Sequence, residues 1–383
     1  MMKNNQHIIL QIILVLIGLL CINQPVEGQI VFGQPPAGDL KLIYQSWTIE
    51  DSAGAQTKLT QWVIPILAYI PVYDNWEVIF SSSTAGSSVD IDNGSNSDLS
   101  GLNDTRISVY TSFWDDHLML GMGLNLPTGK KALNSEEVSI TNWLTESFLN
   151  FPVKNYGEGL GINFEAGYAR TVDIYSFGFG AGYIFKTAYE PLDGTDDYKP
   201  GNQLRLGGFG SFNNDQLLGS MSMVYYLFSD DELDGDPVFR DGGMLDLKLQ
   251  FGYVHSNVVT VLGFREIIRA KDKRIEDNQL VTEEEKSHGA ESRVYLQSEL
   301  TLNERLALKG LINYKHVAAN GYDDSSLRSL GASNYLGLGL GAETGLTDIF
   351  KGYGQFEYYT GSADDGDYDL SGWQIVVGMG ATF

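Results

Sequence analysis

The stretch that decides the fold spans residues 372–383 and reads GWQIVVGMGATF. Its larger side chains recur at every second residue, on one face that holds Trp373, Ile375, Val377, Met379, Ala381 and Phe383. Most of the residues between them are small or polar, namely Gln374, Val376, Gly378, Gly380 and Thr382. A period of two is typical of a β-strand with two different faces. The stretch therefore predicts a strand that ends on an aromatic residue.

A terminal strand of this kind resembles the closing strand of bacterial outer-membrane β-barrels. The barrel-assembly machinery recognises that closing strand. We therefore expect Phe383 to act as an assembly signal. The alternative is the last strand of a soluble β-sandwich or barrel. The composition fits a membrane barrel, because 44 of the 383 residues are glycine and no apolar run after residue 28 reaches the roughly 18 residues that a membrane helix needs.

Residues 1–28 have the pattern of a secretory signal peptide. Lys3 supplies the positive charge, residues 8–20 form the apolar run, and cleavage is expected after Gly28. The only cysteine, Cys21, lies in this segment, so we expect no disulfide framework. Residues 29–38 are predicted to be a short periplasmic tail, and residues 39–383 the outer-membrane barrel.

The formal net charge of the chain is −24. An acidic chain repels phosphate groups, so we expect no nucleic-acid partner. The expected partners are outer-membrane lipid, the assembly machinery and a small hydrophobic solute.

About 16 stretches have the length and composition of tilted membrane strands. Fourteen strands, without the first pair, is the alternative count. The candidate strands are residues 39–50, 57–72, 74–84, 104–114, 116–127, 158–172, 174–187, 202–213, 215–228, 242–256, 257–269, 291–303, 304–317, 331–344, 347–361 and 371–383.

The connections between these stretches alternate between short and long. Tight turns such as 114–116 and 256–257 are followed by long loops such as 85–103, 128–157 and 270–290. Outer-membrane barrels have this asymmetry, with short periplasmic turns and long extracellular loops. The fold class predicted is an all-β, antiparallel transmembrane barrel with one helical extracellular loop and both termini in the periplasm.

Alternation also assigns the faces of the strands. A charged side chain at lipid depth costs ~2–4 kcal/mol, so charged residues within strands should point into the lumen. In strand 257–269, Arg265 and Glu266 are adjacent, so one of them must lie near an interface. The predicted lumen wall consists of Arg106, Glu165, Arg205, Asp246, Lys248, Arg293, Glu299, Lys309 and Lys315.

The loop 128–157 is predicted to contain a helix. Asn134 or Ser135 is suited to cap it, and Pro152 is expected to end it. Apolar residues recur at helical spacing and are expected to form an apolar mouth that contacts solute, namely Ile140, Trp143, Leu144, Phe148 and Phe151. The alternative is a helix that packs on the rim and only stabilises the barrel.

Two segments resemble a known family. Residues 100–129 read SGLNDTRISVYTSFWDDHLMLGMGLNLPTG, and residues 159–168 read GLGINFEAGY. They resemble the barrel family associated with meta-pathway phenol degradation, a distant relative of the FadL-type transporters. This resemblance implies an outer-membrane barrel that passes small hydrophobic molecules. FadL-type proteins carry an amino-terminal hatch, for which residues 29–38 are too short, so we expect loop 128–157 to form the constriction.

Other chemical groupings are weaker. Acidic loop residues such as Asp230, Asp231 and Asp234 supply oxygen ligands for Ca²⁺, but their spacing matches no EF-hand and a solvated loop is the simpler interpretation. His255 and Ser256 are adjacent on a strand, so their side chains point to opposite faces and cannot form a nucleophile–base pair. We expect no enzyme activity, no cofactor and no metal site.

The predicted function is passive uptake of small hydrophobic or aromatic compounds. Two alternatives remain open: a general polar porin, which the mixed lumen charges favour, and a closed structural or binding barrel.

Overall fold

The computed structural model describes residues 37–382, except residues 74, 93, 95, 131, 193, 196 and 324. The predicted signal peptide, residues 29–36 and Phe383 lie outside the described residues. The first strand begins at Ala37, two residues before the predicted start of the barrel.

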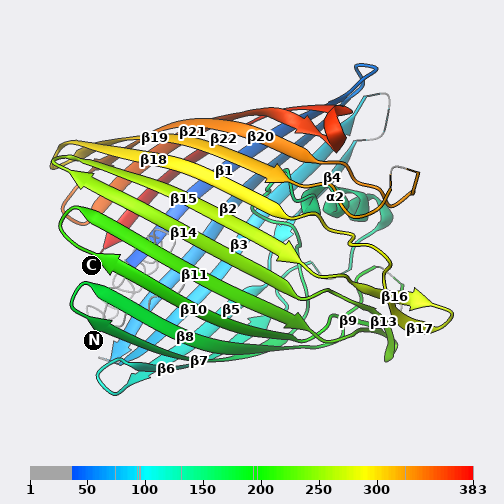
Figure 1. The fold of residues 1–383 in the computed structure, drawn as a ribbon, viewed down its shortest axis with the longest axis horizontal. Helices are drawn as coiled ribbons and strands as arrows, with labels where there is room; N and C mark the ends of the chain where they lie inside the picture. Colours follow the sequence, from blue (N-terminus) through cyan, green and yellow to red (C-terminus); the bar gives the residue numbers. More distant parts are fainter. Residues whose placement is uncertain are drawn as a thin grey trace, which may run out of the picture.

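The chain forms a closed antiparallel barrel of 16 strands (Figure 1). Closure is made by the first and last strands, whose register pairs Ala37 with Thr382. All 16 predicted strands are present, so the predicted count is confirmed. They are β1 (Ala37–Asp51), β2 (Gln56–Tyr73), β3 (Trp76–Ile91), β5 (Thr105–Phe113), β6 (Leu118–Leu126), β7 (Gly161–Val172), β8 (Tyr175–Lys186), β10 (Gln203–Asn213), β11 (Leu217–Phe228), β14 (Met244–His255), β15 (Val258–Arg269), β18 (Glu291–Asn303), β19 (Leu306–Val317), β20 (Ser333–Gly345), β21 (Phe350–Ala363) and β22 (Tyr368–Thr382).

The fourth strand of the barrel is broken. Its first part is β4 (Ser97–Leu102), which pairs with residues 84–89 of β3. Its second part is β5, which pairs with residues 76–81 of β3. Leu99 and Arg106 are seven positions apart, so in an unbroken strand their side chains would point to opposite faces. Both face the lumen, because the break at residues 103–104 shifts the alternation by one residue. The prediction of a long loop at 85–103 was wrong, because β3 and β4 occupy most of it.

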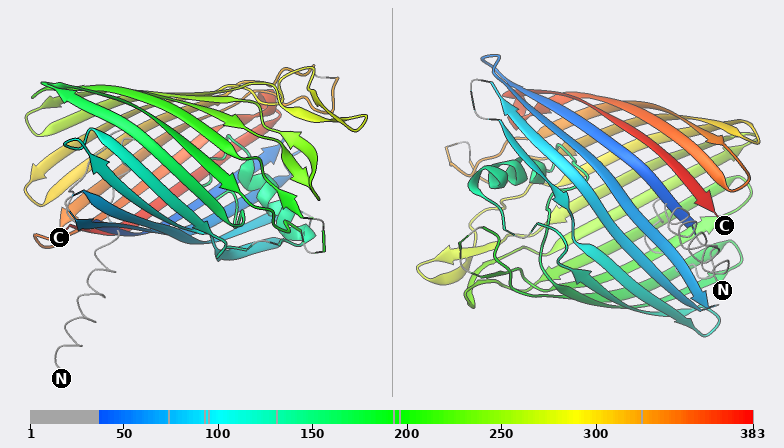
Figure 2. Two further views of the ribbon diagram at one scale, coloured as in Figure 1. Left: turned by 90° about the horizontal axis from the view of Figure 1, so that it is seen from below. Right: turned by 180° about the vertical axis from the view of Figure 1, so that it is seen from behind.

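The connections at one end of the barrel are short turns, whereas the other end holds the long connections together with two short ones, residues 52–55 and 364–367; Figure 2 shows both ends. We call them the turn end and the loop end. The start of β1 and the end of β22 both lie at the turn end. At the loop end, segments predicted as plain loops form a small five-stranded sheet. It consists of β9 (Tyr198–Lys199), β12 (Asp231–Leu233), β13 (Asp236–Arg240), β16 (Lys273–Glu276) and β17 (Gln279–Thr282), and a short 3₁₀ turn, η1 (Asp364–Gly366), precedes β22.

The two faces of the wall differ as transmembrane barrels require. Large apolar side chains such as Leu249, Phe251 and Leu338 are exposed on the outer face. Exposed aromatic residues gather next to the short turns, as in the aromatic girdle of a membrane interface: Tyr73, Trp76, Phe113, Trp114 and Tyr175. None of the helices among the described residues has the length and apolar character needed to cross a membrane.

Candidate functional site

The candidate site is the lumen, and its main feature is the long loop 128–157. Its helix is α2 (Ser135–Thr145), which lies at the loop end next to β4 (Figure 1). Asn134 caps the helix: its side chain accepts from the N–H groups of Glu136 and Glu137, and the Glu137 carboxylate accepts from the Asn134 N–H. The helix ends at Thr145, so Phe148 and Phe151 lie beyond it and the expectation that Pro152 ends it was wrong.

Two buried glutamines of the barrel wall attach the loop to the lumen side. The Gln61 amide donates to the Val153 carbonyl at 2.7 Å, and the Gln61 side-chain oxygen accepts from the Val153 N–H at 3.0 Å. The Gln45 amide donates to the Leu149 carbonyl at 2.9 Å. These bonds replace the water that the loop backbone would otherwise bind, so the loop folds into the barrel instead of standing above it.

The apolar residues of loop 128–157 were predicted to form a mouth that contacts solute, but three of the five are buried. Ile140, Leu144 and Phe151 are 0%, 1% and 3% exposed, because they pack against wall residues such as Leu59, Val89 and Leu99. These three cannot offer an apolar surface to a solute in this arrangement. Trp143 and Phe148 are only partly buried and remain candidates for such a contact.

A carboxylate shared by two arginines forms the first charged group on the wall. Glu165 on β7 accepts from Arg106 at 3.0 Å and from Arg205 at 2.7 Å. Arg205 and Glu165 stand on either side of Gly182 in one row across three strands. A β-carbon on Gly182 would lie 3.3 Å from the Glu165 side chain and 3.4 Å from the Arg205 guanidinium, so the glycine leaves room for this ion pair.

The second charged group lies on β14, β15, β18 and β19. Arg265 binds Asp246 through two nitrogens, at 2.9 and 2.6 Å, and Lys248 lies 3.9 Å from the same carboxylate. Glu291 lies 3.4 Å from Lys315 and 3.2 Å from Arg269. Arg265 thus points into the lumen, whereas Glu266 lies on the outer face, three residues before the loop-end residue Arg269 of β15, and accepts from Ser292. Alternation alone left the orientation of Arg265 open.

A third charged group lies near the turn end. Lys309 lies 2.9 Å from Glu343 and 3.4 Å from Glu299, and Lys351 also reaches Glu343 at 3.1 Å. Arg293 belongs instead with the second group: it lies two residues from the loop-end start of β18, pairs in register with Arg265 and Lys315, and donates through Nε to the neutral side chain of Asn313 at 2.8 Å. All nine residues predicted for the lumen wall therefore occupy inward-facing positions, but they form three separate groups rather than one ring.

The wall opposite the loop carries small side chains. Lumen-facing positions on β7, β8 and β10 hold Gly167, Gly180, Gly182 and Gly207. A hollow of about 390 Å³ lies beside them and is lined on the lumen side by Tyr110, Phe209, Tyr226 and Arg205. A second hollow of about 480 Å³ nearer the turn end is lined by Ser176, Ser211, Ser220 and Gln250. The loop fills one side of the lumen, and small residues line the other.

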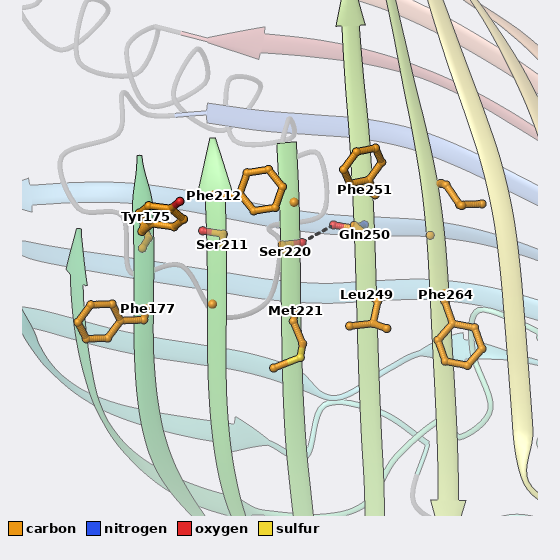
Figure 3. Close-up of a pocket in the computed structure, with 15 residues that line it drawn as sticks. Tyr175, Phe177, Ser211, Phe212, Ser220, Met221, Leu249, Gln250, Phe251 and Phe264 are labelled. Atoms are coloured by element: carbon orange, nitrogen blue, oxygen red, sulfur yellow. Dashed lines mark hydrogen bonds between the residues drawn. The ribbon is translucent and has the colours of Figure 1, made fainter. Parts of the chain in front are cut away.

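A larger hollow, of about 710 Å³, belongs to the outer face (Figure 3). Phe177, Phe212, Met221 and Phe251 surround two outward-facing glycines there. The dashed hydrogen bond in the figure joins Ser220 and Gln250, at 3.2 Å, which occupy the alternate positions facing the lumen. Because this hollow is apolar and faces away from the lumen, it suits an acyl chain of the bilayer and is separate from the passage.

The other candidate groups lie apart from the lumen. His255 is the last residue of β14, and Ser256 lies in the following turn with a φ of 54°. Among the described residues, no three His, Cys, Asp or Glu side chains are grouped to hold a metal ion.

No family model and no curated protein matches the sequence, so the resemblance to the phenol-degradation family has no support from these comparisons. Solved barrels match the structure over most of its length. A FadL homologue of Pseudomonas aeruginosa covers 96% of this chain and 96% of its own, with a TM-score of 0.46 and 8% identity. Pseudomonas putida OprB covers 91% and 94%, with a TM-score of 0.45 and 12% identity. Pseudomonas aeruginosa OprD covers 93% and 96%, with a TM-score of 0.43 and 11% identity. At these scores and identities the matches carry no argument about what passes through the lumen.

Proposed function

We propose that this protein is an outer-membrane channel through which small solutes pass by diffusion. The observation that carries the proposal is the division of the lumen. Loop 128–157 is fixed to one side by Gln45 and Gln61, while the opposite side is lined by glycine and serine and keeps hollows of about 390 and 480 Å³. A constriction beside a continuous polar path is what selective passage requires.

Small aromatic solutes are the first candidate class. Tyr110, Phe209 and Tyr226 line the hollow of about 390 Å³, next to the guanidinium of Arg205. Aromatic rings favour offset or edge-on contact with another ring, and the guanidinium also stacks on ring faces. A general polar porin is the second candidate, which the burial of Ile140, Leu144 and Phe151 and the charged wall support.

Single-channel currents in a planar bilayer, recorded with and without phenol, test this proposal. Brief openings whose duration changes with phenol are the result expected for an aromatic-selective channel. A large, steady conductance that ignores phenol favours the polar porin. The absence of any current overturns the proposal and favours a closed barrel.

A further inference from the structure

We infer that the outer face of the barrel binds one phospholipid of the leaflet at the turn end, with its phosphate on Arg170 and an acyl chain in the apolar hollow of about 710 Å³. This inference concerns the membrane face and does not depend on what passes through the lumen. The basis is a series of directly paired residues on six neighbouring strands, which we call the outer row. It consists of Arg170, Phe177, Gly210, Met221, Leu249 and Phe264.

Arg170 is a basic residue that points toward lipid. Glu165, on the same strand, points into the lumen, where it binds Arg106 and Arg205. An odd number of positions separates Arg170 from Glu165, so the two side chains lie on opposite faces of the strand. Arg170 is exposed, and among the described residues no carboxylate forms an ion pair with it. It therefore presents an unpaired positive charge to the membrane.

Arg170 lies at the level of the lipid head groups. It is two residues before Val172, the turn-end residue of β7, and exposed Tyr175 begins the next strand at the same end. A charge on the lipid face is costly at the middle of the bilayer but costs little near the interface, where a long side chain can reach the head groups. The phosphate of a phospholipid is the anion at this level. The planar guanidinium can hold two phosphate oxygens with parallel hydrogen bonds.

From this level the outer row runs toward the middle of the membrane. Arg170 is two residues from the turn end of its strand, whereas Leu249 is six residues before His255, the turn-end residue of β14. A row of directly paired residues lies at right angles to the strands, which are tilted by roughly 35–45°. Because neighbouring strands are about 4.8 Å apart, the row covers about 24 Å of the wall and about 15 Å of membrane depth. This depth is about half of the roughly 30 Å hydrocarbon core, which is the thickness of one leaflet.

The side chains along the outer row form an apolar trough. Figure 3 shows Phe177, Met221 and Leu249 in this row, on strands that follow one another around the wall. Gly210 lies between Phe177 and Met221, and a β-carbon there would meet no atom within 4 Å, so the space above it is open. In the next row a β-carbon on Gly219 would collide with the Phe212 ring, so this glycine lets the ring lie against the wall. An acyl chain in the trough touches wall atoms on several sides and gains more dispersion contacts than a chain on a smooth wall.

The test is native mass spectrometry of the wild-type protein in detergent, titrated with phosphatidylglycerol. We expect one lipid molecule to bind at a lower concentration than any further lipid. In Arg170→Gln the affinity for this first lipid should fall about ten-fold, the order of effect of one charge-assisted hydrogen bond. Gly210→Leu should also weaken the binding of the first lipid, because the leucine side chain occupies the open space in the trough.

Two matched variants serve as controls. Arg305→Gln removes an exposed arginine from the turn between β18 and β19, at the same end of the barrel but outside the outer row. Gly310→Leu fills equally open space at an outward-facing glycine of β19, away from the hollow. Both variants should bind the first lipid as tightly as the wild type.

Equal binding by the wild type and all four variants would mean that lipid only adsorbs to the apolar belt, and it overturns the inference. A loss in Gly210→Leu but not in Arg170→Gln overturns the assignment of the phosphate to Arg170. A protein dimer that Gly210→Leu disrupts would mean that a second copy of the chain covers the hollow, which also overturns the inference. Retention of the heat-resistant barrel band on a gel shows that each variant folds.

Discussion

The replacement Gln61→Leu should release loop 128–157 from the wall. Gln61 is buried, and its side chain holds both the N–H and the carbonyl of Val153 while donating to Ser87 at 2.9 Å. Leucine has a similar volume and cannot form these bonds. Two buried backbone groups of Val153 then lack a partner, at a cost of ~1–3 kcal/mol each. The attached state of the loop therefore loses about 2–6 kcal/mol relative to a state in which water reaches Val153.

Even the lower figure of about 2 kcal/mol shifts the equilibrium between attached and released loop about 30-fold. Single-channel recording should show this shift as more frequent transitions between conductance levels. The control is Thr60→Val: Thr60 bonds Ser88 at 2.6 Å across the same pair of strands, on the face that points away from the lumen. Gln61→Leu channels that have the conductance and the transition frequency of the wild type would refute the idea that these contacts hold the loop beside the passage.

Three further predictions concern the loop, the membrane face and the loop-end sheet. Deletion of residues 134–151 should raise the single-channel conductance, and an unchanged conductance would show that the loop does not narrow the path. Leu249→Lys on the outer face should lower the free energy of unfolding in lipid by ~2–4 kcal/mol, because it places a charge against lipid. Gln250→Lys on the lumen face is the control and should change this free energy little. Equal losses of the two variants in urea titrations would contradict the assigned faces. Burial raises the pKa of Asp272, but the His288 ring 3.4 Å away and the hydrogen bond from the Gly242 N–H outweigh it and leave the pKa below its ordinary value of 3.8. The resulting stabilisation is present above that value and is lost as the pH falls below it. Amide exchange in β16 and β17, relative to its intrinsic rate, should therefore accelerate as the pH falls below about 4 in the wild type but not in Asp272→Asn.

The barrel itself could be predicted because lipid imposes a strict rule on every strand. Leu245, Leu247 and Leu249 alternate with Asp246 and Lys248. A shift of the strand by one residue would place both charges against lipid, and the free-energy cost of that arrangement fixes the register. Turn residues such as Asp115 and Ser256, both with positive φ, separate the strands. These signals are local in sequence, so a single sequence contains them.

The interior could be predicted only in part, because its structure depends on contacts between distant segments. The run 81–88 reads SSSTAGSS and has no apolar alternation, yet it continues β3, and Ala85 and Ser87 pack against the inner loop. The spacing of Ile140 and Leu144 indicated a helix with one apolar face. It did not indicate which part of the barrel this face would pack against. That surface is the lumen side of β1 to β4, about 40 or more residues away along the chain.

The lumen-facing cations show the same limit. The inward orientation of Lys248, Arg293 and Lys315 followed from alternation, but their alignment depends on the register between four strands. Register is set by the complete set of cross-strand pairs and by the length of each connection. The grouping of these cations therefore emerged only from the structure.

The central claim is that a continuous path remains beside the inner loop. Swelling of liposomes that contain the purified protein, in an isotonic solution of arabinose, tests this claim most directly. We predict swelling faster than that of protein-free liposomes, and faster still when residues 134–151 are deleted. A swelling rate equal to that of protein-free liposomes, for a protein that is folded in the membrane, would contradict the claim.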